Sequence, residues 1–287
     1  MSKVLNSNPS GANAGEGESM SDELFSSPFL WQKQRRDDIS AASDAHAVVL
    51  QPIGSIEQHG RHLPLDTDSW TAGVICVRAA ALAGELPVLV LPPVWWGLSP
   101  YWMTFAGTVS LRVETILALL GDIAASVREH GFDRLVLVNG HGGNSGLIEA
   151  MAAQLSDERL RVAAVSYWKL APETIVSVSE VDHGSSGHSG EMETSIQLYL
   201  QQSTVDLGRL EARDCTDIDV RAKLVGGTAA YLPPNPGGES PSGVYGAGYA
   251  GTAEKGKHVV EAASIGLAEF VKKFWAAYRA SNSAAAG

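Results

Sequence analysis

The sequence is poor in cysteine and in basic charge, and each shortage excludes a class of protein. Two of its 287 residues are cysteines, Cys76 and Cys215, which is too few for a disulfide-stapled fold. We expect Cys76 to be a core thiol in a reducing cytoplasm, while a single disulfide stays open. Lys and Arg number 21 against 32 Asp and Glu. The net charge of −11 argues against unspecific binding to nucleic acid or to anionic membranes.

Long apolar runs and a secretory signal are also missing. No stretch reaches the ~18 uninterrupted apolar residues that a membrane-spanning helix needs. Residues 1 to about 20 are rich in Gly, Ser, Asn and Glu and lack the apolar segment of a signal peptide. We expect residues 1–24 and 281–287 to be disordered tails around a single domain, 25–280. A hydrophobic content of 45% suits a domain with a sizeable core.

Strand-like and helix-like segments alternate along the first half of the chain. Apolar runs indicate strands over residues 47–53, 88–91, 135–138 and 161–167, separated by helical patterns over 69–86, 114–129 and 145–155. This alternation predicts an α/β fold, in which a mostly parallel sheet carries helices on both faces. Ligands of such sheets bind at the carboxyl ends of the strands. Other expected segments are a short helix within 25–34, a loop over 168–190, helices over 191–202 and 251–278, and an irregular stretch over 205–242.

Carboxylates and imidazoles crowd the segment 54–68, directly after the first expected strand. In an extended chain, the two-residue spacing places Glu57 and His59 on one side. The glycine and proline that follow let the chain return Asp66 or Asp68 to the same place. Oxygen and nitrogen ligands in this mixture suit a divalent metal ion. A polar surface loop is the alternative interpretation.

Two further clusters lie at expected loops. Residues 139–144 read Asn-Gly-His-Gly-Gly-Asn, with His141 at a strand end. The glycines indicate a close backbone approach, a tight turn or a phosphate cradle, although the spacing matches neither a dinucleotide-binding motif nor a P-loop. Residues 187–195 place carboxylates in a first helical turn, where the helix dipole favours them, and their candidate side chains are His188, Glu191 and Glu193.

A nucleophilic serine is the competing idea for an enzyme. Ser185, Ser186 and Ser189 all lie near histidines in the sequence. The chain has no G-x-S-x-G nucleophile elbow, so a Ser/His/Asp triad is the weaker hypothesis.

Together the three clusters resemble the motifs of the creatininase (creatinine amidohydrolase) family. The matching stretches are Gly54-Ser55-x-Glu57-Gln58-His59-Gly60-x-His62-Leu63-Pro64-Leu65-x-Thr67-Asp68, Asn139-Gly140-His141-Gly142-Gly143-Asn144 and Gly187-His188-Ser189-Gly190-x-x-Glu193-Thr194-Ser195. The resemblance runs from about residue 45 to residue 275. It implies a single α/β domain with two divalent ions, zinc or manganese, that hydrolyses C–N bonds of amides. It also implies a homo-oligomer, with a hexamer among the expected forms.

The resemblance assigns metal-binding roles to particular residues. It makes Glu57 and His141 ligands of one ion, and His59 a ligand of the other. Asp68 ends the Leu-Pro-Leu-x-Thr-Asp motif, so the resemblance assigns it, and not Asp66, as the carboxylate that bridges the ions.

The fifth ligand is where this chain departs from creatininase itself. That enzyme has a metal-binding glutamate two residues after the histidine of the second motif, and this chain has Gly143 there. Other branches with the His-Gly-Gly-Asn sequence use the glutamate of the Glu-Thr-Ser motif, which is Glu193. The resemblance therefore keeps the metal site but weakens the case for creatinine as the substrate.

The residue types suit hydrolysis of a small cyclic or linear amide by a metal-bridged hydroxide. We expect His188 to protonate the leaving nitrogen, with Glu191 as a second candidate. His62 is expected either to hold a ligand carboxylate or to be structural. The aromatic residues expected to wall the substrate pocket, or alternatively to pack in the core or at a subunit contact, are Trp95, Trp96, Tyr101, Trp102 and Trp168. The alternative functions are hydrolysis of a non-amide cyclic or carbonyl substrate and non-catalytic metal binding.

Overall fold

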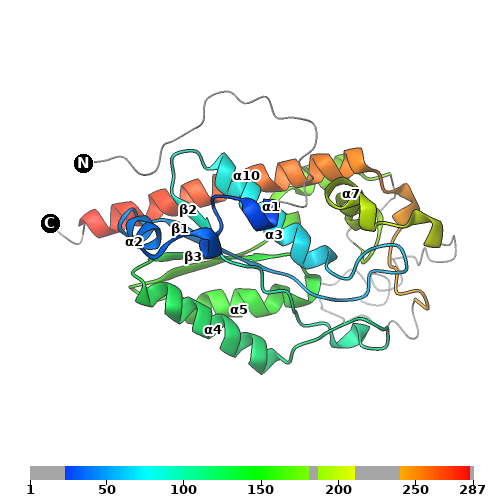
Figure 1. Ribbon diagram of the computed structural model, residues 1–287, viewed down its shortest axis with the longest axis horizontal. Helices are drawn as coiled ribbons and strands as arrows, with labels where there is room; N and C mark the ends of the chain where they lie inside the picture. The colour runs from blue at the N-terminus through cyan, green and yellow to red at the C-terminus, as the bar shows by residue number, and fades with distance from the viewer. Residues whose placement is uncertain (1–22, 181–186, 211–239, 285–287) are drawn as a thin grey trace.

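A four-stranded parallel sheet forms the centre of the computed structural model, which describes residues 23–180, 187–210 and 240–284 (Figure 1). The strands are β1 (Val48–Ile53), β2 (Val88–Val90), β3 (Arg134–Asn139) and β4 (Arg161–Ser166), in the spatial order β2-β1-β3-β4. Each neighbouring pair is parallel. The predicted α/β fold with a parallel sheet is therefore confirmed.

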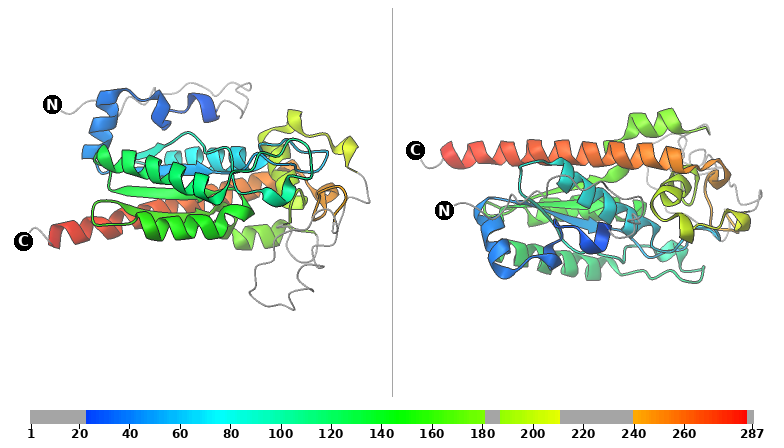
Figure 2. Two further views of the ribbon diagram at one scale, coloured as in Figure 1. Left: turned by 90° about the horizontal axis from the view of Figure 1, so that it is seen from below. Right: turned by 45° about the horizontal axis from the view of Figure 1, so that its top comes forward.

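Helices cover both faces of this sheet, as predicted. On one face lie α3 (Thr67–Leu82), α7 (Glu191–Leu200) and α10 (Ala253–Ala284), and on the other lie α4 (Val113–Glu129) and α5 (Ser145–Leu155) (Figure 1). Figure 2 shows α10 running the length of the sheet. Each face of the sheet has its own hydrophobic core, and alternate residues of β1 contribute to the two. Val48 and Leu50 pack under α3 and α10, whereas Val49 packs under α4 and α5.

Two short helices were not expected from the sequence. α2 (Arg36–Asp44) has nine residues, most of them polar, and buries only Ala42, so little apolar surface marks it in the sequence. The segment expected to be a loop over 168–190 contains α6 (Pro172–Val178), which begins with proline at the first helical position. The other short elements are α1 (Glu23–Ser26), η2 (Trp31–Lys33), η3 (Pro100–Trp102), η4 (Gly142–Asn144), η5 (Tyr167–Leu170), η6 (Gln202–Thr204), η7 (Leu207–Arg209) and η9 (Gly248–Ala250).

The C-terminal helix is longer than expected, and Cys76 is placed as expected. α10 continues to Ala284, past the expected end near residue 278 and into the stretch expected to be a tail. Most of the other expected tail, most of the irregular stretch 205–242 and Cys215 lie outside the described residues. Cys76 is a buried free thiol, as expected. Among the described helices, none is both long and apolar enough to cross a membrane.

The point between β1 and β3 is where the connections diverge. β1 leads away to β2 on one side, whereas β3 leads to β4 on the other. Ile53 and Asn139, the last residues of β1 and β3, are paired in register. At Gly140 a Cβ atom would lie 2.2 Å from the main-chain oxygen of Asp68, so the end of β3 meets the start of α3 at backbone distance. Open parallel sheets bind ligands at such a switch point, and the candidate site lies here.

Candidate metal centre

The loop after β1 brings three candidate ligands together. The main-chain N–H of Glu57 donates to the oxygen of Leu65 at 3.0 Å, which folds the loop back on itself. The chain then enters α3, whose first turn carries Asp68. A carboxylate is favoured at this end of a helix by the helix dipole. Glu57 and His59 are fully buried and Asp68 is 3% exposed, which excludes a polar surface loop.

Asp68 divides its two oxygens between two groups of side chains. Its Oδ2 lies 3.0 Å from Nδ1 of His141, which is also 3.3 Å from Oε1 of Glu57. Its Oδ1 lies 3.2 Å from Nε2 of His59, which is 3.6 Å from Oε2 of Glu193. The ligand atoms of each group are close enough to hold one metal ion. The structure thus brings together all five residues expected as ligands, with Glu57 beside His141 as expected, and it places Glu193 beside His59, a pairing that the sequence had left open. Asp66 belongs to neither group.

Outward hydrogen bonds fix which nitrogen of each histidine faces the cluster. Nδ1 of His59 lies 3.1 Å from the main-chain oxygen of Glu57, and Nε2 of His141 lies 3.1 Å from that of Leu98. A carbonyl only accepts, so these outward nitrogens carry a proton, and the opposite nitrogens are the ones that would present lone pairs to a metal ion. Asn139 orients the second histidine, since its side chain donates to His141 O and accepts from His141 N.

The buried atoms at the centre of the cluster fit a bound cation. Among the described residues, Oε1 of Glu57, Nε2 of His59 and Oδ2 of Asp68 have no hydrogen-bond partner. Buried polar atoms are normally satisfied, because leaving them unpaired costs free energy. Carboxylate oxygens and imidazole nitrogens turned toward one another are satisfied by divalent ions such as Zn²⁺ or Mn²⁺. These residues therefore fit the metal that the sequence motifs imply.

The shifted pKa values of the cluster also fit a site for a cation. Burial alone lowers the pKa of His59, but Asp68 and the other carboxylates outweigh it and raise that pKa to about 10. Burial raises the pKa of Asp68, but His59 and His141 hold it below its usual range. Burial, opposed by His59 and reinforced by the charge of Asp68, raises the pKa of Glu193 to about 7. Without a metal ion, the site thus retains protons in place of the cation.

His188 lies on the open side of the cluster. Its Nε2 is 2.6 Å from the main-chain oxygen of Gln58, and its Nδ1 is 3.4 Å from Oε1 of Glu57. Its ring stacks on Trp102 with centroids 4.0 Å apart. Burial and the neighbouring His59 lower the pKa of His188, so the imidazole is neutral. The side chains of His188 and Glu193 are 14% and 13% exposed, whereas those of Glu57, His59, Asp68 and His141 are at most 5% exposed, so solvent reaches the site from here.

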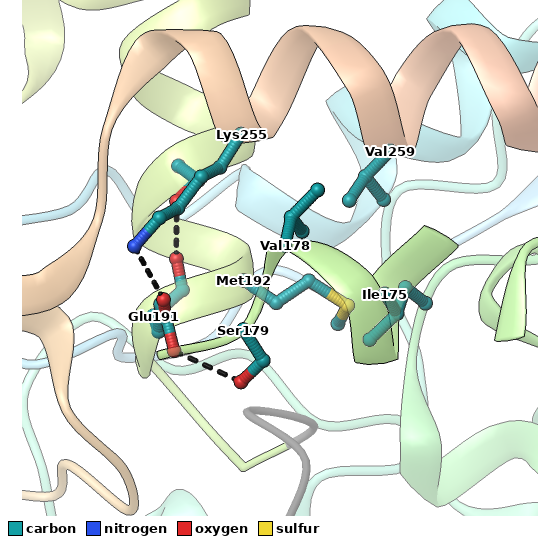
Figure 3. Close-up of a pocket in the computed structure, with 8 residues that line it drawn as sticks. Ile175, Val178, Ser179, Glu191, Met192, Lys255 and Val259 are labelled. Carbon is teal, nitrogen blue, oxygen red and sulfur yellow. Dashed lines mark hydrogen bonds and ion pairs between the residues drawn. The ribbon is translucent and has the colours of Figure 1, made fainter. Parts of the chain in front are cut away.

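Glu191 does not lie with the cluster. It is two residues before Glu193 on α7, and a helix turns through about 200° over two residues. Its carboxylate is 2% exposed and accepts from Lys255 at 2.7 Å and from Ser179 at 3.1 Å (Figure 3). Among the described residues it belongs to none of the candidate metal groups.

Two of the five aromatic residues expected at the pocket reach the site. Tyr101 places its hydroxyl 3.3 Å from Nε2 of His141, and Trp102 stacks on His188. Trp102 is 2% exposed, so its ring supports the imidazole from behind. Trp95 and Trp168 instead pack against the core under α3 and α10, as the alternative interpretation had it, and Trp96 is 46% exposed.

Sequence reasoning missed Ser99, which supports two candidate ligands. Its hydroxyl donates to Oε2 of Glu57, lies 3.2 Å from Nε2 of His141 and lies 2.6 Å from the hydroxyl of Ser55. Ser99 follows a predicted strand at some distance and stands in no motif with a histidine or an acid, so nothing in the sequence singled it out.

Other side chains have partners that were not expected. Asn144 stands at the N-cap position of α5, but its side chain makes no capping hydrogen bond. Its amide instead accepts from Leu98 N at 3.0 Å and donates to Gly54 O at 3.0 Å, which ties the loops after β1, β2 and β3 together. His62 contacts the hydroxyl of Thr194 at 2.9 Å, next to Glu193.

The serine-triad hypothesis finds no support in the part of the chain that the structure describes. The hydroxyl of Ser189 is buried and makes no hydrogen bond to a described residue. Ser185 and Ser186 lie outside the described residues.

Fold and site together define an α/β protein with a carboxylate–histidine cluster that could hold metal ions at the ends of its parallel strands. The model of the family described as "Creatininase: Creatinine amidohydrolase" matches residues 32–271, and the chain belongs to this family. It is 33% identical to the mycofactocin precursor peptide peptidase of Mycobacterium ulcerans (74% of this chain and 79% of the relative). It is 31% identical to the creatinine amidohydrolase of Pseudomonas putida (67% and 77%).

Solved structures agree with this assignment. A creatininase described as "Creatininase Mn" superimposes with a TM-score of 0.75 and 26% identity, over 86% of this chain and 98% of that chain. A mutant creatininase described as "Zn-Zn type" superimposes with a TM-score of 0.73 and 25% identity, over 90% and 99%.

Proposed function

We propose that this chain is a metal-dependent amidohydrolase that cleaves the C–N bond of a small cyclic or linear amide. The observation that carries the proposal is the division of Asp68 between His141 and Glu57 on one side and His59 and Glu193 on the other. Two similar proteins, a creatinine amidohydrolase and a peptide peptidase, bear names of enzymes that act on C–N bonds.

The proposed cofactors are two divalent ions, Zn²⁺ or Mn²⁺, that share Asp68. Glu57 and His141 would hold one ion, and His59 and Glu193 the other. Bound there, such ions supply a hydroxide nucleophile near neutral pH and polarise the amide carbonyl. The protein contributes the arrangement of the ligands, since Ser99 and the carbonyls of Glu57 and Leu98 orient them from outside.

His188 is the residue that we propose moves the proton. Its Nε2 lies 2.6 Å from the Gln58 carbonyl oxygen and 2.9 Å from the Gln58 side-chain amide nitrogen. The carbonyl is the nearer and can only accept, so we assign the proton of the neutral ring to Nε2, which leaves the lone pair on Nδ1, the nitrogen that faces the cluster. Nδ1 would therefore take the proton that the water gives up in forming the hydroxide nucleophile, and would pass it to the leaving nitrogen when the C–N bond breaks. The His188 ring lies between the stacked ring of Trp102 and the tilted ring of His59, and these two contacts hold it in this orientation.

The surroundings of Gly143 support a substrate other than creatinine. The resemblance places the metal-binding glutamate of creatininase itself at this position. Here a Cβ atom would lie 2.3 Å from the Tyr101 hydroxyl and 2.5 Å from Nε2 of His141, so both side chains occupy the space that a longer residue would need. We propose that Tyr101, close to His141, contacts the substrate instead.

A panel of amides tests the proposal. The purified chain is treated with a chelator, reloaded with Zn²⁺ or Mn²⁺, and assayed on creatinine, on N-formyl compounds and on short peptides. Hydrolysis that disappears on chelation and returns with metal supports the proposal, and no hydrolysis of any amide contradicts it. Glu57→Ala and His141→Ala are expected to lose metal and activity together. Glu114→Ala and His130→Ala, which remove exposed residues of the α4 region, are the matched controls.

A further inference from the structure

Glu191 is a buried acid that the metal centre does not use. It is the first residue of α7 and is 2% exposed, although an acid at the start of a helix is usually solvated. It lines a small pocket together with the apolar side chains of Val178, Met192 and Val259, which lie to one side of it (Figure 3). A charge in such a place needs partners, because an unpaired buried charge is strongly destabilising.

The partners of Glu191 come from two other helices. From the end of α6, the Ser179 hydroxyl and the Glu180 N–H donate to its carboxylate at 3.1 and 3.0 Å. From the first turn of α10, the Lys255 ammonium donates at 2.7 Å. Lys255 also contacts Glu180 Oε1 and Ala250 O, both at 2.8 Å. Glu191 thus joins the end of α6, the start of α7 and the start of α10.

A second set of contacts joins α7 to the start of α10. The Ser195 hydroxyl donates to Glu191 O at 2.6 Å and accepts from Thr252 N at 3.0 Å. At Gly256 a Cβ atom would lie 1.9 Å from Ser195 O, so α10 crosses α7 at backbone distance. The start of α7 therefore has little freedom on the side that faces α6 and α10.

The other side of α7 is held by the helix that carries Asp68. The Gln197 amide donates to the Thr71 hydroxyl at 3.0 Å and to Thr67 O at 3.3 Å, both on α3. α7 is thus fixed between α3 on one side and α6 with α10 on the other. The distance from Glu193 to Asp68 and His59 depends on this placement of α7.

The placement of α7 also reaches His188. Ser189 has a positive φ of 58°, and its N–H donates to Glu193 Oε2 at 2.6 Å. A serine adopts such a backbone conformation only when its surroundings fix it. His188 precedes it directly, so a shift at the start of α7 moves both the candidate ligand and the candidate proton carrier.

We infer that Glu191 is a positioning residue, which, clamped by Lys255 and the end of α6, sets where Glu193 and His188 stand in the metal centre. This inference rests on the proposed function, because that function defines what these two residues do. Glu191 itself touches neither the metal nor the substrate.

The test compares Glu191→Gln and Lys255→Met with Lys272→Met. Glutamine keeps the shape of Glu191 without its charge, and methionine keeps most of the lysine stem. Lys272 is an exposed lysine of the same helix whose ammonium donates to Leu82 O at 2.9 Å, away from the clamp, so its variant is the matched control. Hydrogen exchange of the metal-free proteins reports on the clamp, and Mn²⁺ titration followed by electron paramagnetic resonance reports on the ligands.

Loss of the clamp is expected to raise the amide exchange rates of Glu180 and Ser189 about tenfold. It is also expected to weaken Mn²⁺ binding about tenfold, which is the lower end of the range for residues that orient metal ligands. The double variant is expected to resemble the singles, because both act through one contact. Lys272→Met should match the wild type. Wild-type exchange at Ser189 together with wild-type Mn²⁺ affinity in both clamp variants would overturn the inference. A different result would contradict the proposed function but not this inference. In that case the wild type binds Mn²⁺ and hydrolyses no amide, while the clamp variants still show faster exchange and weaker Mn²⁺ binding.

Discussion

Asp68 is the residue on which the metal centre depends, since its two oxygens serve different groups. Replacing it with asparagine removes the shared charge while keeping the size of the side chain. We expect Asp68→Asn to lose both metal ions and to lower kcat by on the order of 100-fold or more. Metal content by mass spectrometry is the measurement. Asp66→Asn is the control, because Asp66 accepts from Gln201 and lies outside both groups. Retention of both ions by Asp68→Asn would contradict the sharing.

Ser99 orients the carboxylate of Glu57, and its replacement tests how much this orientation contributes to metal binding. Its hydroxyl donates to Glu57, so Ser99→Ala leaves a ligand carboxylate with one orienting bond fewer. Metal affinity is expected to fall by about 10- to 100-fold while the fold survives. Ser126→Ala, which removes a hydroxyl from an exposed site on α4, is expected to change nothing. Equal affinities of the two variants would show that Ser99 does not orient Glu57.

The raised pKa of Glu193 gives a pH dependence with a definite sign. A carboxyl group with a pKa of about 7 holds a proton below that pH in the folded, metal-free chain, but the unfolded chain releases it near its ordinary value of 4.5. Its protonation thus stabilises the metal-free fold at low pH, and this contribution is lost as the pH rises through 7. A metal ion must displace the same proton.

Metal binding is therefore expected to release about one proton more at pH 6 than at pH 8. Calorimetry in buffers of different ionisation enthalpy measures the number released. Glu193→Gln should abolish the difference between the two pH values, since glutamine does not titrate. A wild type that releases the same number of protons at both would rule out Glu193 as the group responsible.

At the scale of elements, the packing of the end of β3 on the start of α3 sets the site. A Cβ atom at Gly140 would collide with the main chain of Asp68. We expect Gly140→Ala to destabilise the fold by about 1–3 kcal/mol and to weaken metal binding, because the ligand-bearing segments must separate.

Gly146→Ala provides the opposite expectation within α5. No atom lies within 4 Å of the Cβ position there, so alanine should stabilise the helix by up to about 1 kcal/mol. Thermal unfolding of both variants is the measurement. A stable Gly140→Ala protein with normal metal affinity would show that the close approach is unimportant.

The elements that could be predicted from the sequence are those with a strong apolar pattern. The buried runs of β1 and β3 and the amphipathic α4 are of this kind. α2 and α6 were missed, because both are short and α2 is mostly polar. Of the site, the charged and imidazole residues stood in motifs. Ser99 and the clamp at Glu191 could not be predicted, because they depend on contacts between segments far apart in the chain.

At the scale of the whole molecule, the sheet acts as the platform that assembles residues from four segments. Glu57 and His59 follow β1, His141 follows β3, and Asp68 and Glu193 enter from α3 and α7. We also propose, from family resemblance, that the chain forms a homo-oligomer. Light scattering of the purified protein would report its mass, and a monomer at working concentration would contradict that proposal.

The central claim is that Asp68 is shared by two ions. Anomalous diffraction at the manganese edge from Mn²⁺-loaded crystals tests it most directly. Two peaks are expected, about 3.5–4 Å apart, with Asp68 between them. Glu57 and His141 should surround one peak, and His59 and Glu193 the other. A single peak, or peaks that do not contact Asp68, would contradict the claim.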